Sequence, residues 1–148
     1  MPEFQLIKEI LKRSIARNWD AARREWTLLD VYETDQPETC LCGHFPIIEL
    51  CELLNARNQK QVVVGNCCVK KFIGLPSDKI FQAVKRIRKD TSKSLNTEAI
   101  RHALHRKWIN EWESSFYLDV MRKRDLTPKQ HAKKLEINER VLSHMKRS

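Results

Sequence analysis

The chain has 148 residues, 41% of them hydrophobic, which is enough for one compact domain with a core of its own. No window approaches the ~20 apolar residues of a membrane span, and the first residues lack the basic-then-apolar layout of a signal peptide, so we expect a cytoplasmic protein without a membrane partner. The net charge of +9 is uneven, because residues 1–55 contain six Lys or Arg and ten Asp or Glu (−4), whereas residues 56–148 contain 22 and nine (+13).

The first predicted element is an amphipathic helix over residues 3–17. Its apolar side chains recur at spacings of three and four and would share one face: Phe4, Ile7, Leu11 and Ile15. We expect this face to pack on the body of the protein, and docking on a partner is the alternative. Asn18 then predicts a helix cap, and residues 20–26 predict a second short helix.

The next segments predict a small sheet. Residues 27–32 are rich in Leu, Val and Tyr and predict a strand, while residues 33–39 have the polar, acidic character of a loop. Residues 47–54 are an apolar run of strand length, residues 55–59 supply turn residues, and residues 61–64 form a short β-branched strand. The last three segments together predict a β-hairpin.

All five cysteines lie in or beside this hairpin. One cluster is Cys-Leu-Cys-Gly-His at residues 40–44, and the other is Gly-Asn-Cys-Cys at residues 65–68. Zinc takes four thiolate or imidazole ligands in a tetrahedron, and clustered cysteines in a reducing compartment bind metal more often than they form disulfides. Glycines beside both clusters permit the tight backbone that such a site requires. The pattern predicts one structural Zn²⁺.

The predicted zinc ligands are Cys40, Cys42 and Cys68, with His44 as the fourth and Cys67 as its alternative. The spacing from Gly65 to Cys68 leaves a full turn in which to aim the sulfur atom. Cys51 lies in the middle of a predicted strand and is expected to be a buried free thiol. In the competing interpretation all five cysteines are core thiols. A site closed by four protein ligands would hold the hairpin together and would have no room for a reactive water.

The remainder of the chain predicts helices. Residues 69–73 begin with a short helix that Gly74 can end in a left-handed conformation. Ser77 is a suitable N-cap for the next helix, whose apolar stripe is Ile80, Val84 and Ile87. After a polar break at residues 91–96, a helix over residues 97–107 would turn three side chains inward: Ile100, Ala103 and Leu104.

Two more helices are expected near the end of the sequence. Asn110 can cap the first, in which one face would contain Trp112, Phe116 and Val120. The second starts with an N-cap Thr127, Pro128 at the first helical position and Gln130 where a capping box needs it. This helix should run to about Met145.

Taken together, these elements predict an α+β fold that is mostly helical. A small zinc-stabilised hairpin or short sheet, zinc-ribbon-like, would be surrounded by about five to six α-helices. The amphipathic helix would occupy residues 1–19, the zinc-ribbon-like core residues 20–75, and a basic helical region packed on that core residues 76–148. We expect one domain overall.

Three stretches resemble a known family. They are residues 40–48, where Cys-x-Cys-Gly-His leads into an Ile-rich strand, the Asn-containing turn at residues 55–58, and Val-Gly-Asn-x-Cys-Val-Lys-Lys-Phe at residues 64–72. The chain is similar here to small, largely uncharacterised zinc-ribbon-like proteins carried by bacteriophages, prophages and plasmids. Further similar stretches lie at residues 75–81, 108–112 and 126–130, so that the resemblance covers roughly residues 20–142.

The resemblance implies Cys40, Cys42 and Cys68 as ligands, permits His44, and tolerates other residues at Cys67. The turn departs from the family pattern because it lacks a glycine. The family has no established activity to transfer. It implies a mobile-element setting, in which small zinc proteins handle nucleic acid or block host defence.

The basic half of the sequence predicts a module that binds DNA or RNA without catalysis, through salt-dependent phosphate contacts. The candidate contacts are Lys70, Lys71, Lys85, Arg86, Arg88, Lys89, Arg122, Lys123 and Arg124. A solvated helical surface rich in Lys and Arg is the plainer interpretation. Trp108 and Trp112 are one turn apart and could stack on bases, although a role in the core or toward a partner is more usual for such residues.

Two other functions compete with this prediction. A protein-interaction factor that inhibits or modulates a host enzyme or defence system could use the acidic residues beside the metal site: Glu33, Asp35 and Glu38. A small nuclease would need a His with a metal and a base. His102 and His105 are three apart and should share a helical face, but no general-base motif accompanies them, so we expect no enzymatic activity.

Overall fold

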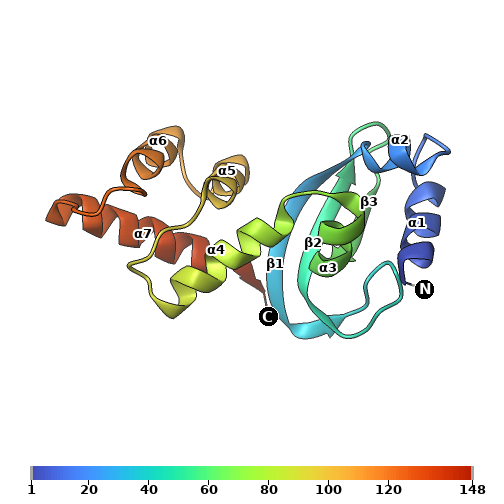
Figure 1. Cartoon of the computed structure of the whole chain (residues 1–148), viewed down its shortest axis with the longest axis horizontal. Helices are drawn as coiled ribbons and strands as arrows, with labels where there is room; N and C mark the ends of the chain where they lie inside the picture. The colour runs from blue at the N-terminus through green and yellow to red at the C-terminus, as the bar shows by residue number, and fades with distance from the viewer. Residues whose placement is uncertain (1, 148) are drawn as a thin grey trace. The chain divides into compact units, whose positions relative to one another are not determined.

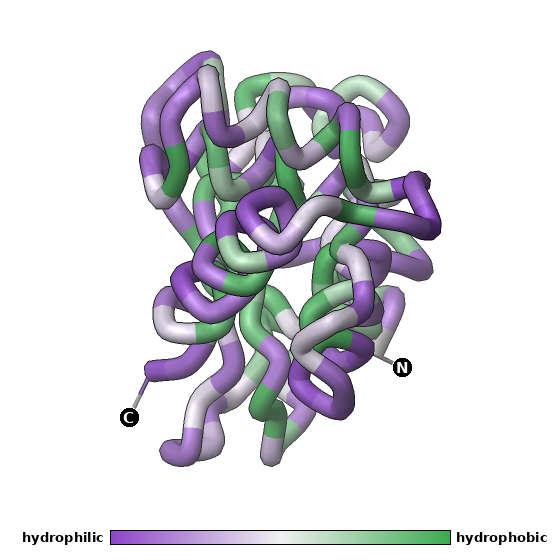
Figure 2. The backbone as a smooth tube through the Cα atoms, turned by 90° about the vertical axis from the view of Figure 1, so that its left-hand side faces the viewer, coloured by the Kyte–Doolittle hydropathy of each residue, from purple (hydrophilic) through white to green (hydrophobic). Residues whose placement is uncertain are grey.

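The computed structural model describes residues 2–147 and has an α+β fold, shown in Figure 1. The chain divides into two compact units: a first unit of residues 2–78 together with Arg147, and a second unit of Lys79–Lys146. Hydrophilic and hydrophobic residues are interspersed along the backbone (Figure 2). Among the described residues, no helix is long and apolar enough to cross a membrane.

The first unit contains the three long strands of the sheet and four helical segments. Its elements are α1 (Pro2–Lys12), α2 (Trp19–Arg23), β1 (Trp26–Glu38), β2 (Ile47–Asn55), β3 (Gln61–Gly65), α3 (Asn66–Cys68) and the π-helical turn η1 (Val69–Ile73). Helix α4 (Ser77–Lys89) begins in this unit and continues in the second. The second unit also contains α5 (Thr97–His105), α6 (Glu111–Val120) and α7 (Pro128–Met145), and β4 (Lys146–Arg147) follows.

The sheet has the strand order β3-β2-β1-β4. Strand β2 pairs antiparallel with both β1 and β3, which confirms the predicted hairpin. Strand β1 is longer than expected, because the segment of residues 33–39 was predicted to be a loop and all but its last residue belong to the strand. Both ends of this polar segment pair with β2, because Glu33 lies opposite Glu49 and Glu38 lies opposite Ile47.

The hairpin turn contains no glycine, and the buried side chain of Asn55 holds its backbone in shape. The Asn55 Oδ1 atom accepts hydrogen bonds from the backbone N–H groups of Arg57 at 2.8 Å and Asn58 at 3.2 Å. Its Nδ2 atom donates to Glu25 Oε1 at 2.8 Å. Gln59 then takes the left-handed conformation, with φ at 65°. A polar side chain inside the turn therefore fixes a backbone shape that glycine would otherwise permit.

A helix forms near the predicted start, but α1 ends five residues before the predicted residue 17 and buries a different face. Leu6 and Ile10 are fully buried, whereas Phe4 is 71% exposed and Ile15 is 48% exposed. The helix ends at Lys12, so Ile15 lies beyond it. The predicted apolar face was therefore wrong, because a neighbouring stripe one helical position away packs inward instead. The predicted cap is confirmed: Asn18 Oδ1 accepts from the Ala21 N–H at 2.9 Å.

The second unit confirms most of the predicted helix boundaries. Capping boxes start α6 at Asn110 and α7 at Thr127, and the expected stripe of α4 is buried. The buried face of α6 differs from the prediction, since Trp112 is 63% exposed while Glu113 and Tyr117 are buried. The tryptophan instead stacks on Phe116 at the surface, with 5.5 Å between ring centroids.

Two polar networks lie inside the second unit. Tyr117 Oη donates to Asn138 Oδ1 at 2.6 Å and accepts from the Leu95 N–H at 2.9 Å. Both carboxylate oxygens of Glu113 accept from Arg140 Nη1 at 2.8 Å, and Lys133 Nζ lies 2.9 Å from Oε2. Burial disfavours the ionised form of Glu113, but these cations outweigh it and lower the pKa of the carboxyl group to about 2.

Candidate metal centre

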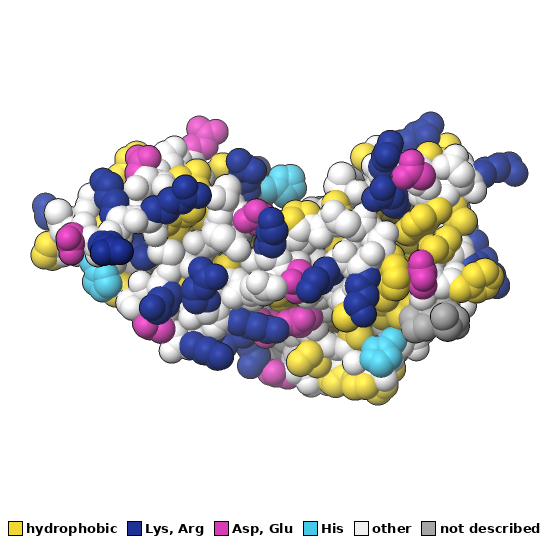
Figure 3. All heavy atoms as spheres, viewed as in Figure 1, with side chains coloured by type: hydrophobic (Ala, Val, Ile, Leu, Met, Phe, Trp, Pro, Cys, Tyr) yellow, Lys and Arg dark blue, Asp and Glu magenta, His cyan; other side chains and the backbone are white. Residues whose placement is uncertain are grey.

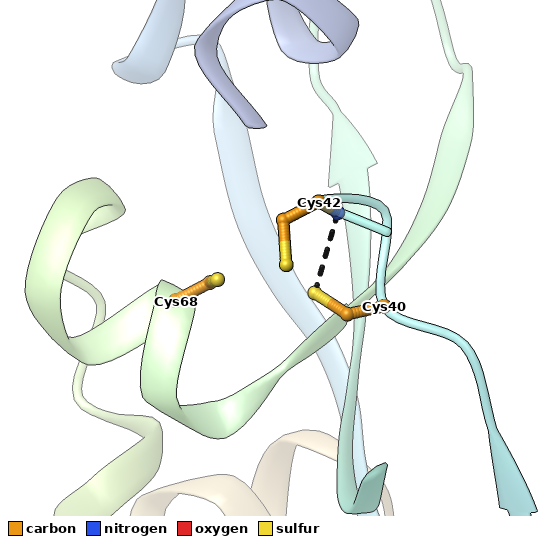
Figure 4. A group of neighbouring side chains, drawn as sticks. All are labelled: Cys40, Cys42 and Cys68. Carbon is orange, nitrogen blue, oxygen red and sulfur yellow. Dashed lines mark hydrogen bonds between the residues drawn. The ribbon is translucent and has the colours of Figure 1, made fainter. Parts of the chain in front are cut away.

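Three cysteines from two separate segments meet in the first unit. Cys40 and Cys42 lie on the loop between β1 and β2, and Cys68 ends α3 after β3. Their sulfur atoms all lie within 4.8 Å of one another, and all three residues are buried. Figure 4 shows the three side chains pointing toward a common centre. The structure therefore brings together the three ligands that the spacing predicted, and this cluster could hold a metal ion.

A tight loop presents the first two thiols. The Cys40 N–H donates to the His44 carbonyl at 2.9 Å, and the Gly43 N–H donates to the Cys40 carbonyl at 2.8 Å. Gly43 has a φ of +92°, which residues with a side chain rarely adopt. The loop thus folds back on itself within five residues, and this turn carries Cys40 and Cys42 to the same side.

Backbone N–H groups surround the Cys40 sulfur atom. The Cys42 N–H donates to Cys40 Sγ at 3.5 Å (dashed in Figure 4), and the Gly65 N–H donates at 3.2 Å. A hydrogen bond from Cys68 together with these N–H groups lowers the pKa of Cys40 to about 5, against the opposing effect of burial. The same contact with Cys40 raises the pKa of Cys68. Such an environment stabilises a thiolate, which is the form that binds a metal.

Gly65 lies beside the Cys40 sulfur atom. A Cβ atom added there would lie 3.4 Å from Ile47 Cγ2 and 3.7 Å from Cys40 Sγ. These are ordinary van der Waals distances, so the role of this residue at the cluster is the hydrogen bond from its N–H. The sequence pattern pointed to this glycine but not to its hydrogen bond.

Asn66 fixes the start of the helical segment that carries Cys68. Its side chain is buried, and its Oδ1 accepts from Ser77 Oγ at 2.7 Å. Its Nδ2 donates to Asp78 Oδ1 at 3.1 Å and to Glu49 Oε1 at 3.3 Å. From the sequence, Asn66 was expected only to form part of a turn. Its position inside the Gly-Asn-Cys-Cys cluster was the feature that could have indicated a role beside the cysteines. Ser77 was predicted to be an N-cap, and its hydroxyl instead donates to this asparagine.

Neither candidate for the fourth ligand belongs to the cluster. Within residues 2–147, His44 and Cys67 are not part of any group of metal-ligating atoms as close as the three thiols, and both residues are exposed. Both nevertheless line a pocket of about 360 Å³ whose wall includes all three thiols. The remaining lining residues are Glu3, Ile47, Gly65, Lys71 and Phe72.

Cys51 has the role that the sequence predicted. It is a free thiol, completely buried in β2 and outside the cluster. Burial raises the pKa of this thiol to about 12. It is therefore a core residue, protonated at neutral pH.

The predicted nucleic-acid contacts all lie at the surface, in both units. Lys70 and Lys71 belong to the first unit, where Lys70 Nζ lies 3.2 Å from Asp78 Oδ2 and Lys71 lines the pocket. The others belong to the second unit and are exposed: Lys85, Arg86, Arg88, Lys89, Arg122, Lys123 and Arg124. The nine predicted contacts are thus divided between the units, two in the first and seven in the second.

Two predicted pairs of side chains do not share a face. Trp108 follows α5 and precedes α6 in the sequence. It is buried and stacks on His144, with 5.0 Å between ring centroids, whereas Trp112 lies on the surface of α6. They cannot form the pair of stacking residues that their spacing suggested. His102 is buried and His105 is exposed, although both belong to α5. Both histidines belong to one helix, as predicted, but only His102 lies on its buried face.

Comparison with protein-family models, with curated proteins and with solved structures finds no match for this chain. The cysteine cluster and the uneven distribution of charge are the features of the chain that bear on its function.

Proposed function

We propose that this chain is a zinc-ribbon-like protein of the phage or mobile-element type that binds nucleic acid without catalysis. One structural Zn²⁺ would be held by Cys40, Cys42 and Cys68 in the first unit, and basic helices of the second unit would contact phosphates. The reduced cytoplasm, of a bacterial host if a phage encodes the protein, is where such thiols stay available.

The residues present fit a zinc ion. Three sulfur atoms within 4.8 Å of one another can belong to one coordination sphere, and two backbone N–H groups already donate to one of them. Thiolates are the ligands that zinc prefers in structural sites. A bound ion would tie the β1–β2 loop to α3, since the ligands Cys42 and Cys68 are 26 residues apart in the sequence.

The unequal net charge of the two units is the observation that supports the proposed binding of nucleic acid. Residues 79–146 contain 17 Lys or Arg and eight Asp or Glu, a net charge of +9, while residues 1–78 and Arg147 together contain 11 of each. The net charge of the whole protein therefore resides in the helical unit. A basic unit of this kind attracts polyanions and binds them in a salt-dependent, sequence-tolerant way.

The clearest phosphate contacts are the three consecutive cations after α6. Arg122, Lys123 and Arg124 are exposed, and within the described part of the chain no ion pair neutralises them. Lys and Arg side chains are also spread widely over the visible face of the helical unit (Figure 3). Close charges on one loop can follow a phosphate backbone without any base readout.

A salt titration tests this function. Binding of generic single- and double-stranded DNA and RNA is measured by fluorescence anisotropy between low and physiological salt. We expect affinity to fall steeply with salt, and the triple variant Arg122→Gln, Lys123→Gln, Arg124→Gln to lower the slope of log K against log salt by about 0.7 to 0.9 per lost phosphate contact. The matched control replaces three exposed cations of the neutral unit: Lys8, Arg17 and Lys60. Absence of binding at low salt would refute the proposal.

Exposed apolar side chains in the first unit favour a second candidate, a protein-interaction factor acting on a host enzyme or defence system. Phe45 is 60% exposed and Ile48 is 54% exposed, both on or beside the cysteine loop. Hydrophobic side chains also gather on the visible face of that unit in Figure 3. If the chain fails to bind nucleic acid at low salt and instead retains one host protein, with loss of that contact in Phe45→Ser, this function replaces the first.

A further inference from the structure

We infer that Trp112 and Phe116 form a platform on which the bases of a single-stranded nucleic acid stack. This inference rests on the proposed function, and it narrows the ligand of the second unit from nucleic acid in general to unpaired strands of DNA or RNA.

Trp112 is an exposed tryptophan in a chain that otherwise covers this residue type. Trp26 and Trp108 are buried and Trp19 is half-buried, whereas Trp112 is 63% exposed. Burial of a large aromatic side chain contributes strongly to stability, and α6 forgoes that contribution here. Tryptophan is enriched where a protein meets a partner, because its ring offers a large apolar face and a polar N–H group.

The tryptophan and a phenylalanine form a parallel pair. Trp112 and Phe116 lie one turn apart on α6, with 5.5 Å between ring centroids and 9° between ring planes. A base that lies on this pair would extend an existing stack. Stacking of this kind tolerates any base, because every base has a π-face. The pair therefore suits the sequence-tolerant binding that phosphate contacts also give.

The turn of α6 that carries Trp112 is fixed in place. Asn110 and Glu113 form the capping box at its start, and the Glu113 carboxylate contacts both Arg140 and Lys133. Lys133 Nζ also lies 5.9 Å from the centroid of the Trp112 ring. A ring that is positioned before binding loses less conformational entropy when a ligand contacts it.

Cations lie after the pair in the sequence and on the helix beside it. Helix α6 ends at Val120, four residues or ~6 Å beyond Phe116, and three exposed cations come soon after: Arg122, Lys123 and Arg124. Lys129 and Lys133 lie one turn apart on α7, and Lys133 already contacts the tryptophan ring. A strand whose bases stack on the pair would thus have cations available for its phosphates.

The exposure of the bases distinguishes single strands from duplexes. In a duplex the neighbouring base pairs cover both faces of each base, so rings on a helix surface can stack there only after the duplex is partly unstacked. Phosphate contacts alone make no such distinction. A protein partner would also cover two exposed rings, but the net charge of +9 on the second unit favours a polyanion.

Fluorescence anisotropy at low salt tests the inference on the full chain. Four probes of equal length are compared: oligothymidine, oligouridine, a mixed-sequence duplex, and an abasic strand that keeps the phosphates but has no bases. We expect the parent to bind both homopolymers more tightly than the abasic strand. Trp112→Leu keeps an apolar side chain without a ring, so it should weaken homopolymer binding about five- to 150-fold and leave binding of the duplex and the abasic strand unchanged.

Two further variants separate the ring from its bulk and its exposure. Trp112→Phe restores an aromatic ring and should recover most of the affinity for the homopolymers. Phe4→Leu is the matched control, because Phe4 is a 71% exposed aromatic residue of the first unit, and it should leave binding of every probe unchanged. Indole fluorescence gives a second readout, since the homopolymers should quench the parent more than Trp112→Phe.

Each other result overturns the inference. If Trp112→Leu binds the homopolymers as tightly as the parent does, the pair does not stack on bases, and salt-dependent binding of all four probes would leave the proposed phosphate contacts intact. If binding is unchanged and Trp112→Leu instead converts a dimeric parent to a monomer in analytical ultracentrifugation, the pair is an interface between copies of the chain. If the parent binds none of the probes, the proposed function fails and the inference fails with it.

Discussion

The two units of this protein bury polar groups in different ways. In the first unit, three thiols converge from two segments, and backbone N–H groups donate to one of them. In the second unit, the buried carboxylate of Glu113 meets two cations, and Tyr117 meets an asparagine and a backbone N–H. These two networks of the second unit are complete with the unit's own side chains, while the thiols of the first unit form a cluster that a metal ion would complete.

The two units therefore differ both in what would stabilise them and in their net charge. The first unit has no net charge and would depend on its metal, whereas the second unit carries all the excess positive charge and would stay folded without a metal. Loss of metal should then unfold one unit and leave the other able to bind a polyanion. Four substitutions test this contrast.

Replacing a metal ligand should have the largest effect. Cys68→Ser removes one of three thiolates, and since structural zinc sites in small domains contribute ~10–16 kcal/mol of apparent binding free energy, we expect loss of the metal and loss of structure in the first unit. Metal content by mass spectrometry and amide hydrogen exchange would show lost protection at residues 26–73 and retained protection at residues 97–145. Cys67→Ser, at the exposed neighbouring thiol, is the control and should keep the metal. Retention of a full complement of metal by Cys68→Ser would contradict the assignment.

In the second unit the largest effect should come from Glu113. Glu113→Gln leaves Arg140 and Lys133 without their buried carboxylate, and breaking a buried pair of this kind should lower the free energy of unfolding by about 3 kcal/mol. Glu136→Gln is the matched control, because Glu136 contacts the same two cations at the surface and should matter by less than about 1 kcal/mol. Urea titration followed by helical circular dichroism measures both. Equal effects would show that burial does not distinguish the two carboxylates.

The same carboxylate predicts a response to acid. Its pKa is about 2 in the folded protein and 4.5 as the ordinary value. A lowered pKa adds stability that is fully present above pH 4.5 and is lost as the pH falls from there toward 2, amounting to about 3 kcal/mol. Urea titrations at pH 6 and pH 3 should therefore differ more for the parent than for Glu113→Gln. An identical pH dependence would sink this assignment.

A smaller effect is expected at Tyr117. Tyr117→Phe removes a hydroxyl that donates to Asn138 and accepts from the Leu95 N–H, so both buried partners lose a hydrogen bond and unfolding should become easier by about 2 kcal/mol. Tyr32→Phe in the first unit is the comparison, since its ring contacts the Arg147 guanidinium at 3.8 Å and this contact survives the change. Thermal unfolding should shift for the first variant and hardly at all for the second.

The smallest effect should come from the cysteine loop itself. Gly43→Ala places a side chain at a φ of +92°, where no heavy atom lies within 4 Å of the new Cβ, so only backbone strain of about 1 kcal/mol is added. Metal should still bind, with its affinity lowered by about fivefold. Gly43→Asn should cost less, because asparagine tolerates the left-handed region better. Competition with a chelator measures both, and complete loss of metal would show that the loop has a role beyond its shape.

The sequence was most informative where local chemistry decides structure. The three thiols of the cluster followed from Cys-x-Cys and Gly-x-x-Cys spacing, and the caps at Asn18, Asn110 and Thr127 followed from residue type. Each of these features depends on atoms a few residues apart. Gly74 likewise ends η1 in the left-handed conformation, with φ at 86°.

The predictions that were wrong share one physical cause. Packing between residues that are distant in the sequence selects one of several arrangements that the local sequence permits. Helix α1 offers two apolar stripes of similar spacing, and only contact with the rest of the unit selects Leu6 and Ile10. The polar end of β1 is a strand because β2 lies beside it. The side-chain direction of Trp112 depends in the same way on contacts that spacing cannot reveal.

The return of the chain to β1 has a consequence for synthesis. Strand β4 lies next to β1 in the sheet, and Arg147 contacts Asp30 and Glu52, its separation from Asp30 being 117 residues. At ~5–20 residues per second, translating Lys79–Lys146 takes roughly 3 to 14 seconds. Throughout that time, the outer edge of β1 on a nascent chain is an uncovered strand, open to pairing with other chains. Once the C-terminal residues leave the ribosome, the two residues of β4 pair with part of this edge.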